Sequence, residues 1–427
     1  MRLSIQNLAK IKNAEIELNG ITVIAGDNDT GKSTVGKALY AMFNGFVNMD
    51  RIIHNQRCHS LANAIINTVA EIVPLPHKNS TLLGGNFGDI IEFSKVLQNE
   101  QLLTYDNIVE RGKEYVLTNY NVNLNDILDD EKSVELERRI RKILQVTNEE
   151  ISRQRVSNMF SRVFQYQINS LQTKNDASVK MQIKSNMVST VISENICKSV
   201  EYDFNISHNA VCVDNPFVID NVSSGFLGGD FVLSRDLATR LSDQIDIDVV
   251  TSIVNEKDLS KVFAIINQAV PGEFDKEDNK LVLRRGAWKE PLNATNLSAG
   301  VKAFAILKIL IQNHQLREKD VLILDEPEIH LHPEWQILYA EFLVLFQKVF
   351  DLTILLTTHS PYFLNAIEVF SRKYDRLDKV NYYKTKVEDD NMVTLVDVTD
   401  SIDEIYGSMA APFNRLNEME QELGMES

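Results

Sequence analysis

The chain has 427 residues, of which 44% are hydrophobic and 24% are charged. This length and balance allow two or three globular domains. No apolar run reaches the roughly 18 residues of a membrane-spanning helix, so we expect none. The net charge of −16 argues against a surface that binds nucleic acid over its whole area. Three widely spaced cysteines, Cys58, Cys197 and Cys212, argue against a disulfide framework or a zinc site and favour a reducing cytoplasm.

Residues 1–45 predict strand, turn, strand, loop and helix. Leu3 and Ile5 belong to the first strand and Glu15–Leu18 to the second, and the start of the chain lacks the pattern of a signal peptide. Ile21–Ala25 is a nearly continuous apolar run, which is typical of a buried central strand.

A glycine-rich loop follows this third strand. Gly26–Ser33 reads GDNDTGKS, matches the pattern G-x-x-x-x-G-K-[ST], and opens a helix through Val35, Leu39 and Met42. Inward-pointing N–H groups and the positive end of a helix bind phosphate, a lysine at this place reaches the β- and γ-phosphates, and Ser33 would ligate Mg²⁺. The predicted nucleotide-binding residues here are Gly26, Asn28, Asp29, Thr30, Gly31, Lys32, Ser33 and Thr34.

The next 200 or more residues carry no catalytic motif. Residues 123–164 have helical apolar spacing, but their heptads are not sustained, so we do not expect a long coiled coil. Ser178–Ile183 and Val211–Asp214 predict strands, residues 237–270 a helix, and Lys280–Arg285 a short strand. Arg138–Arg162 is the candidate for contact with DNA, although a solvated helical face paired with Glu149 and Glu150 explains the same pattern equally well.

Three further motifs follow in the second half of the chain. Ser298, Ala299 and Gly300 precede an amphipathic helix, where a serine is either a simple helix cap or part of an anion site. Val321–Glu326 is an apolar strand that ends in two carboxylates, so Asp325 would hold Mg²⁺ and Glu326 would act as general base. His359 ends another apolar strand, and we interpret it as catalytic rather than structural.

Together these motifs resemble the ABC ATPase superfamily and in particular its SMC-like heads. Gly26–Ser33 is similar to Walker A, Val321–Glu326 to Walker B, Leu297–Gly300 to the signature motif and His359 to the switch histidine. The run Asp325–Pro333, DEPEIHLHP, is similar to that of the OLD-like ATPases of phage defence, including the ATPase subunit of Septu-type systems. The resemblance implies an α/β head with a mixed sheet and a largely helical insertion. It also implies two ATP molecules sandwiched between two copies, where the signature serine and glycine of one head contact the γ-phosphate held by the other.

This sequence departs from the superfamily pattern in three places. The signature reads LSAGV, and His332 stands where transporters carry an aspartate. The Q-loop glutamine is not identifiable, with Gln165 and Gln167 as candidates. His330 and His332 lack a third ligand nearby in sequence, which argues against a metal site.

The resulting prediction is a cytoplasmic, Mg²⁺-dependent ATPase that forms homodimers or larger assemblies and controls an effector, a nuclease, in antiphage defence. Two alternatives remain open: an SMC-like DNA repair or chromosome-maintenance head, and an OLD-like nuclease ATPase without its own Toprim domain. We expect an ATPase domain from residues 1–45 and 281–400, an insertion over 46–280 that partly completes this domain, and an acidic tail over 401–427. In the tail, Pro412 suits the first turn of a helix, and Leu416, Met419 and Leu423 form a stripe that either packs back or docks a partner.

Overall fold

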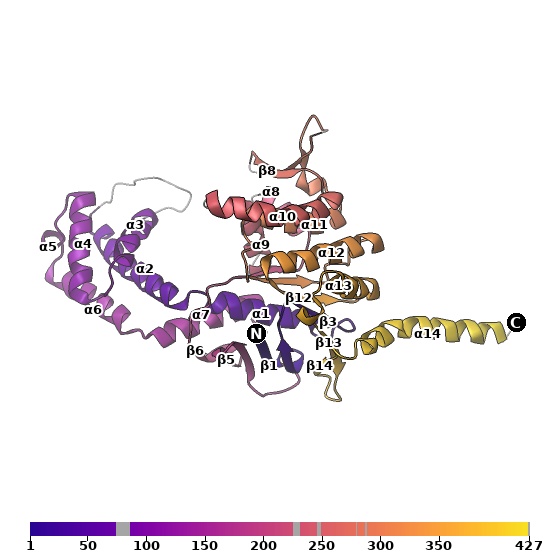
Figure 1. The fold of residues 1–427 in the computed structure, drawn as a ribbon. Coiled ribbons are helices and arrows are strands. Elements are labelled where there is room, and N and C mark those ends of the chain that lie inside the picture. The colour runs from indigo at the N-terminus through magenta and orange to yellow at the C-terminus, as the bar shows by residue number, and fades with distance from the viewer. Residues whose placement is uncertain (74–85, 225–230, 246–248, 279, 287, 426–427) are drawn as a thin grey trace. The chain divides into compact units, whose positions relative to one another are not determined.

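The computed structural model describes residues 1–73, 86–224, 231–245, 249–278, 280–286 and 288–425, without the side chains of 223–224, 249–258, 412–414 and 423–425. The chain forms two compact units, drawn together in Figure 1. The larger unit contains residues 1–47 and 156–427, and the smaller unit contains residues 48–155.

Within the described residues, the larger unit is built on an 11-stranded mixed sheet with the order β6-β5-β4-β1-β2-β14-β13-β3-β12-β11-β7. Its strands are β1 Arg2–Leu8, β2 Ile11–Glu17, β3 Ile21–Ala25, β4 Ala177–Ile183, β5 Asn186–Ser193, β6 Ile196–Tyr202, β7 Ala210–Val213, β11 Val321–Asp325, β12 Thr353–Thr358, β13 Val380–Val387 and β14 Val393–Asp397. The predicted α/β class with a mixed sheet is confirmed.

The sheet has a parallel half and an antiparallel half. Strands β13, β3, β12, β11 and β7 run parallel, whereas β2, β1, β4, β5 and β6 pair antiparallel. The parallel strands β3, β12 and β11 are almost entirely buried because both faces of this half are covered, as their apolar runs require. Their carboxyl ends meet at one edge of the sheet, where ligands bind in open α/β sheets.

Helices cover both faces of the parallel half. On one face α1 (Lys32–Phe46) contacts β7, β11 and β12, and Gly36 permits this approach because a Cβ there would lie 2.9 Å from Cγ2 of Ile323. The other face carries the main apolar core, in which Leu322, Leu324 and Ile354 pack with side chains of the covering helices. These helices include α11 Ala299–Gln312, α12 Pro333–Phe350 and α13 Pro361–Lys373.

A second, three-stranded sheet with the order β10-β9-β8 lies near the start of α11 in the chain. Leu281 and Leu283 of β9 join the main core, as does Leu297, which follows the short helix η1. The remaining elements of the larger unit are α8 Val218–Ser224, α9 Val232–Ser242, α10 Val249–Ala269, β8 Glu273–Glu277, β9 Lys280–Arg284, β10 Leu292–Asn293, η1 Ala294–Asn296, η2 Leu377–Lys379 and α14 Asp403–Met425.

The smaller unit is helical throughout its described residues and has an apolar core of its own. That core includes Leu61, Ile65, Phe93, Val116 and Ile140. Its helices are α2 Met49–Ala70, α3 Phe87–Gln98, α4 Tyr105–Tyr120, α5 Leu124–Ile127 and α6 Asp130–Gln145, and α7 Asn148–Val163 crosses the boundary to the larger unit.

The segment predicted as helical over 123–164 is divided into α5, α6 and α7. Asp129 caps α6 by accepting a hydrogen bond from the Lys132 amide. Before α7, the Thr147 hydroxyl accepts a bond from the Glu150 amide, while the Glu150 carboxylate accepts from the Thr147 amide. This reciprocal capping box starts a new helix, so the segment does not form one long rod.

The two compact units divide the predicted insertion over 46–280. Residues 48–155 form the smaller unit, while 156–280 supply β4 to β8 and α8 to α10 to the larger one. The expectation that a helix begins near Pro412 is wrong, because α14 begins at Asp403 and continues through that residue. Its first turns are held by Ile405, which is buried in the main core, so the helix starts earlier than the proline suggests. Among the described residues, no helix combines the length and apolar character needed to cross a membrane.

Candidate active site

The glycine-rich loop connects β3 to α1 at the carboxyl edge of the parallel strands. Gly31 has φ +78° and forms the N-cap of α1 in the left-handed region, which glycine adopts without steric cost. The Thr30 hydroxyl donates to the Asp27 carbonyl oxygen at 2.7 Å and closes the loop. The first turn of α1 contains no acidic residue, so the positive end of this helix is left for an anion.

Lys32 folds back over this loop. Its Nζ donates to the carbonyl oxygens of Gly26 at 3.0 Å and Asp27 at 2.8 Å, and it lies 3.6 Å from Oε1 of Glu326. Burial lowers the pKa of Lys32, while the charge of Glu326 opposes that shift. A buried ammonium group held by two neutral carbonyl groups is suited to exchange them for phosphate oxygens.

The strand register explains how the carboxylates reach Lys32. Asp325 of β11 pairs with Thr357 of β12, and Thr358 pairs with Ala25, the residue before Gly26. Thr357 Oγ1 donates to Oδ1 of Asp325 at 2.7 Å and accepts from the Glu326 amide at 2.9 Å. Thr357 thus fixes both carboxylate residues, and the sequence interpretation did not assign it a role. The sequence signal that could have identified Thr357 was its position two residues before His359.

Glu326 contacts two other predicted site residues. Its backbone has φ +48°, which turns the chain sharply at the end of β11. Its Oε1 bonds with Nε2 of His359 and also faces Lys32. The structure therefore brings Lys32, Asp325, Glu326 and His359 together at one edge of the sheet.

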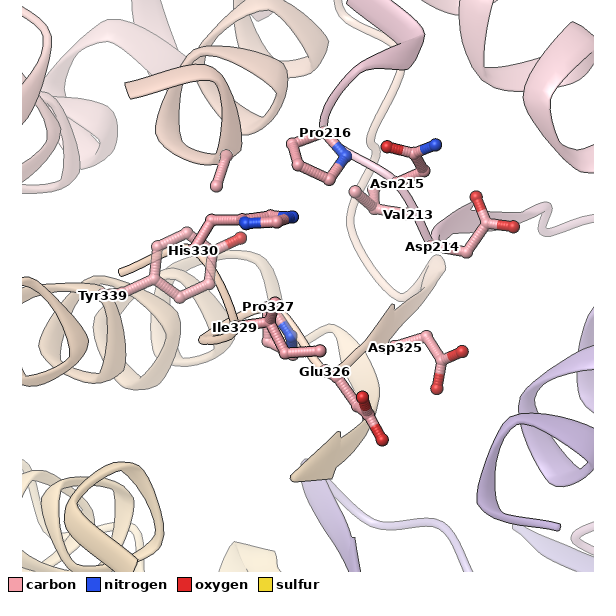
Figure 2. A pocket seen from close by; sticks show the side chains of 11 residues that line it. Val213, Asp214, Asn215, Pro216, Asp325, Glu326, Pro327, Ile329, His330 and Tyr339 are labelled. Carbon is pink, nitrogen blue, oxygen red and sulfur yellow. The ribbon is translucent and has the colours of Figure 1, made fainter. Parts of the chain in front are cut away.

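A pocket opens beside this cluster (Figure 2). It is lined by Val213, Asp214, Asn215, Pro216, Ala303, Asp325, Glu326, Pro327, Ile329, His330 and Tyr339. In Figure 2 the carboxyl groups of Asp325 and Glu326 point away from the ring of His330. The pocket thus has an acidic end and a more apolar end.

Asp214 is an acidic residue of the site that the sequence interpretation missed. Val213 pairs with Leu324, so Asp214 follows β7 next to Asp325. Asp214 keeps exposed surface, yet the protein packed around its carboxyl raises the pKa by desolvation, and Asp325 raises it further. The sequence signal that could have identified Asp214 was the predicted strand over Val211–Asp214, which ends in this carboxylate.

The two glutamine candidates for the Q-loop lie just after α7. Both glutamines are exposed, and Gln165, which has φ +51°, lines a second pocket with Lys37 and Asp214. Neither lines the pocket beside Glu326. Asp214 and Asn215 do, because they directly follow the strand next to β11.

The signature-like segment lies at the start of α11. Ser298 is the N-cap residue, is exposed, and makes no side-chain capping bond. Gly300 packs against the loop after β11, where an added Cβ would lie 3.0 Å from the His330 carbonyl oxygen. Behind it, Lys302 is buried and pairs with Asp220 at 2.7 Å. Ser298 and Ala299 do not line the pocket beside Glu326, so in a single copy they stand apart from it.

The two histidines after Glu326 have separate surroundings. The His330 ring meets Phe217 edge-on at 5.5 Å, and His332 caps α12 by accepting from the Glu334 amide. Among the described residues, no group of three His, Cys, Asp or Glu side chains could hold a metal ion. Mg²⁺ bound beside a nucleotide needs fewer protein ligands, and the oxygens of Ser33 and Asp325 are of the kind it prefers.

Comparison with protein families matches residues 113–365 to the family described as "AAA domain, putative AbiEii toxin, Type IV TA system". The chain belongs to this family of AAA-domain ATPases. A second family, described as "AAA domain", matches residues 2–207 of the AAA-domain ATPase. A search of curated proteins found no match.

Among solved structures, the AAA-domain ATPase is similar to three SMC head domains at 10% identity. The head from Thermotoga maritima has a TM-score of 0.39, with 93% of this chain and 98% of that chain covered. A head bound to the C-winged helix domain of ScpA has a TM-score of 0.40, with 93% and 96% covered. A head with an extended coiled coil, bound to the C-terminal domain of ScpA from Pyrococcus furiosus, has a TM-score of 0.40, with 96% and 98% covered.

Proposed function

We propose that this ATPase hydrolyses Mg²⁺–ATP in sites shared between two copies and thereby controls an effector protein, a nuclease, in prokaryotic antiphage defence. The observation that carries the catalytic part is the convergence of Lys32, Asp325, Glu326 and His359 at the carboxyl ends of β3, β11 and β12.

The loop over Gly26–Thr34 binds the phosphates in this proposal. Its N–H groups and the start of α1 supply a positive end without an acidic side chain. Lys32 exchanges its bonds to Gly26 and Asp27 for bonds to the β- and γ-phosphates. The negative charges of the phosphates would then offset the free-energy cost of burying the ammonium group.

Ser33 and Asp325 would hold the magnesium ion, and Asp214, which follows the strand paired with β11, would contribute through water. When bound, the ion would supply positive charge that neutralises the phosphates. The bond from Thr357 leaves Asp325 with one oxygen free of that contact and orients it. A protein cage of three or more acidic or imidazole ligands is not required.

Glu326 is the general base that deprotonates the attacking water. The bond with His359 restrains its carboxylate, and Thr357 holds its backbone. In this proposal His359, held against Glu326, faces the γ-phosphate. The roles depend on positions set by three different strands, which is why no single motif could place them.

The shared site rests on Ser298. An N-cap serine usually bonds its own helix, and this one does not. Its exposed hydroxyl at the positive end of α11 suits a phosphate supplied by another molecule. A second copy of the chain, bringing its own bound ATP, would complete the arrangement.

The defence role rests on the OLD-like run Asp325–Pro333 and on the matched family, whose description names a toxin. Contact with DNA through Arg138–Arg162 has less support, because Arg138 and Arg139 pair with Glu135 on the same helix and Arg141 pairs with Glu137. An SMC-like repair head remains the second candidate. The short capped helices α5, α6 and α7 do not form the arms that such a role requires.

The test combines the purified protein with ATP, Mg²⁺ and plasmid, with and without the co-expressed product of the neighbouring gene. We expect ATP hydrolysis in both samples and plasmid cleavage only when the partner is present. Plasmid cleavage by the chain alone would favour the OLD-like nuclease alternative. Hydrolysis stimulated by DNA without any partner would favour the repair head.

A further inference from the structure

Glu328 is a buried acid just beyond the catalytic pair. It lies in the turn after β11, where the Ile329 amide bonds the Glu326 carbonyl at 3.2 Å and the Leu331 amide bonds the Glu328 carbonyl at 2.8 Å. Only 3% of Glu328 is exposed. A carboxyl group this deeply buried costs free energy unless its contacts compensate.

One oxygen of this carboxyl group binds the end of β12. Oε1 accepts hydrogen bonds from the Thr358 hydroxyl at 2.5 Å and from the His359 amide at 2.9 Å. The Thr358 oxygen then accepts a bond from the Ser360 amide at 3.0 Å. Glu328 therefore holds the main-chain amide of His359, the residue whose imidazole contacts Glu326.

The contact closes a ring between two loops. From Glu328 the connection runs to the His359 backbone, through the imidazole to Glu326, and back along the chain to Glu328. The other oxygen, Oε2, is buried without a hydrogen-bond partner among the described residues. Desolvation by burial raises the pKa of Glu328, while the bonds from Thr358 and His359 lower it. The two donors, the Thr358 hydroxyl and the His359 amide, both belong to the end of β12 that carries His359, so the buried carboxyl group acts on the position of this residue.

We propose that Glu328 is a positioning residue for ATP hydrolysis: it fixes the His359 backbone so that the imidazole stays against Glu326. This inference rests on the proposed function, since it assigns Glu328 an effect only through His359 and Glu326. Among the described residues, Lys32 bonds to Gly26 and Asp27 and faces Glu326 rather than Glu328, so this inference predicts that nucleotide binding does not depend on Glu328.

The test compares Glu328→Gln and Glu328→Leu in steady-state ATP hydrolysis. The glutamine keeps an oxygen that accepts the two bonds, whereas the leucine removes both. We expect kcat to fall about tenfold or more in Glu328→Leu and to recover in part in Glu328→Gln, with ATP affinity and KM unchanged. Combined with His359→Ala, neither change should lower kcat further, because residues that act through one group are not additive.

The control is Ser371→Ala in α13, where a buried hydroxyl also lacks a hydrogen-bond partner among the described residues. It should leave kcat and the thermal midpoint near those of the wild type. Losses from Glu328 and His359 that simply add would overturn the inference, as would a fall in ATP affinity that matches the fall in kcat. If Glu328→Leu does not fold, Glu328→Gln with and without His359→Ala decides the question.

Measuring Glu326→Gln in the same assay separates the inference from the proposed function. If Glu326→Gln turns over ATP like the wild type, the assigned active site is wrong. If Glu326→Gln is inactive and both Glu328 variants keep wild-type kcat, only the role of Glu328 is wrong.

Discussion

Glu326 has a left-handed backbone conformation that few residues other than glycine adopt. Such a conformation costs on the order of 1 kcal/mol and persists where the surroundings hold it. Here Thr357 bonds the Glu326 amide, and His359 binds its carboxylate. This backbone conformation bends the chain at the end of β11, and the Glu326 carboxylate faces Lys32 as a result.

We predict that Glu326→Gln binds ATP, hydrolyses it roughly 10²-fold more slowly, and accumulates as an ATP-bound dimer. The amide keeps the shape of the side chain but cannot accept the proton of the attacking water. Phosphate release and light scattering with ATP measure the two effects. Glu334→Gln, in the exposed first turn of α12, is the matched control and should behave like the wild type.

Lys32→Met should reduce ATP affinity by at least about tenfold, since a charge-assisted bond to phosphate is lost. Fluorescent-nucleotide titration measures this loss. Lys348→Met, far along the chain on α12, is the control. Undiminished affinity in Lys32→Met would remove Lys32 from the phosphate site.

The same substitution has a pH-dependent effect on the nucleotide-free protein. Burial lowers the pKa of Lys32 in the folded protein below its ordinary value of 10.5. At pH values between these two pKa values, the unfolded chain therefore binds more protons than the folded protein. The free energy of unfolding of the wild type therefore rises with pH toward 10.5. The stability of Lys32→Met relative to the wild type should be highest near neutral pH and should fall as pH approaches 10.5. Denaturant unfolding at several pH values checks this, and a constant difference would contradict it.

At the scale of elements, α11 joins the signature-like segment to the loop after Glu326. Gly300 packs against His330, and Lys302 pairs with Asp220 at 2.7 Å. The helix therefore presents Ser298 on a rigid support. A phosphate bound by Ser298 would therefore be held at a fixed place relative to the rest of that copy of the chain.

We predict that Ser298→Arg keeps ATP binding but lowers hydrolysis about tenfold or more, because the larger cation blocks approach of a second copy. Mixing it with Lys32→Ala protein should restore roughly a quarter of wild-type activity, since half the dimers are mixed and each has one intact site. Ser185→Arg, in the exposed turn between β4 and β5, is the control. No recovery between two folded, exchanging proteins would favour catalysis by single copies.

At the scale of the whole molecule, the acidic C-terminal helix has two parts. Ile405 is buried in the core and Met409 packs against it, whereas Leu416 and Met419 are 57% and 51% exposed. The side chain of Leu423, the third residue of the predicted stripe, lies outside the described residues. The exposed part is therefore the part available to a partner, and its acids favour a basic one.

We predict that truncation after Ala411 leaves a folded protein that binds ATP but no longer retains the co-expressed effector in pull-down. Leu416→Glu with Met419→Glu should have the same effect without shortening the chain. Leu171→Glu changes another exposed leucine and serves as control. Retention of the effector by both altered chains would place its binding site elsewhere.

The sequence by itself determined the parts of the site that lie next to one another in the chain. The loop over Gly26–Ser33, the pair Asp325–Glu326 and the strand before each were predictable, because apolar runs and glycine patterns are local signals. The α/β class with a mixed sheet was also predictable. The break of the helical segment at Thr147 was not predicted, although its capping box is a local signal too.

Only the tertiary structure decided which residues meet across strands. Strand register puts Thr357 beside Asp325 and Asp214 beside the same edge, and no spacing in the sequence encodes that register. It also decided that residues 156–280 complete the large sheet and that α14 begins at Asp403, since burial of Ile405 depends on distant partners. Local patterns set the chemistry of each motif, but hydrogen bonds between strands far apart in the chain set the geometry that joins them.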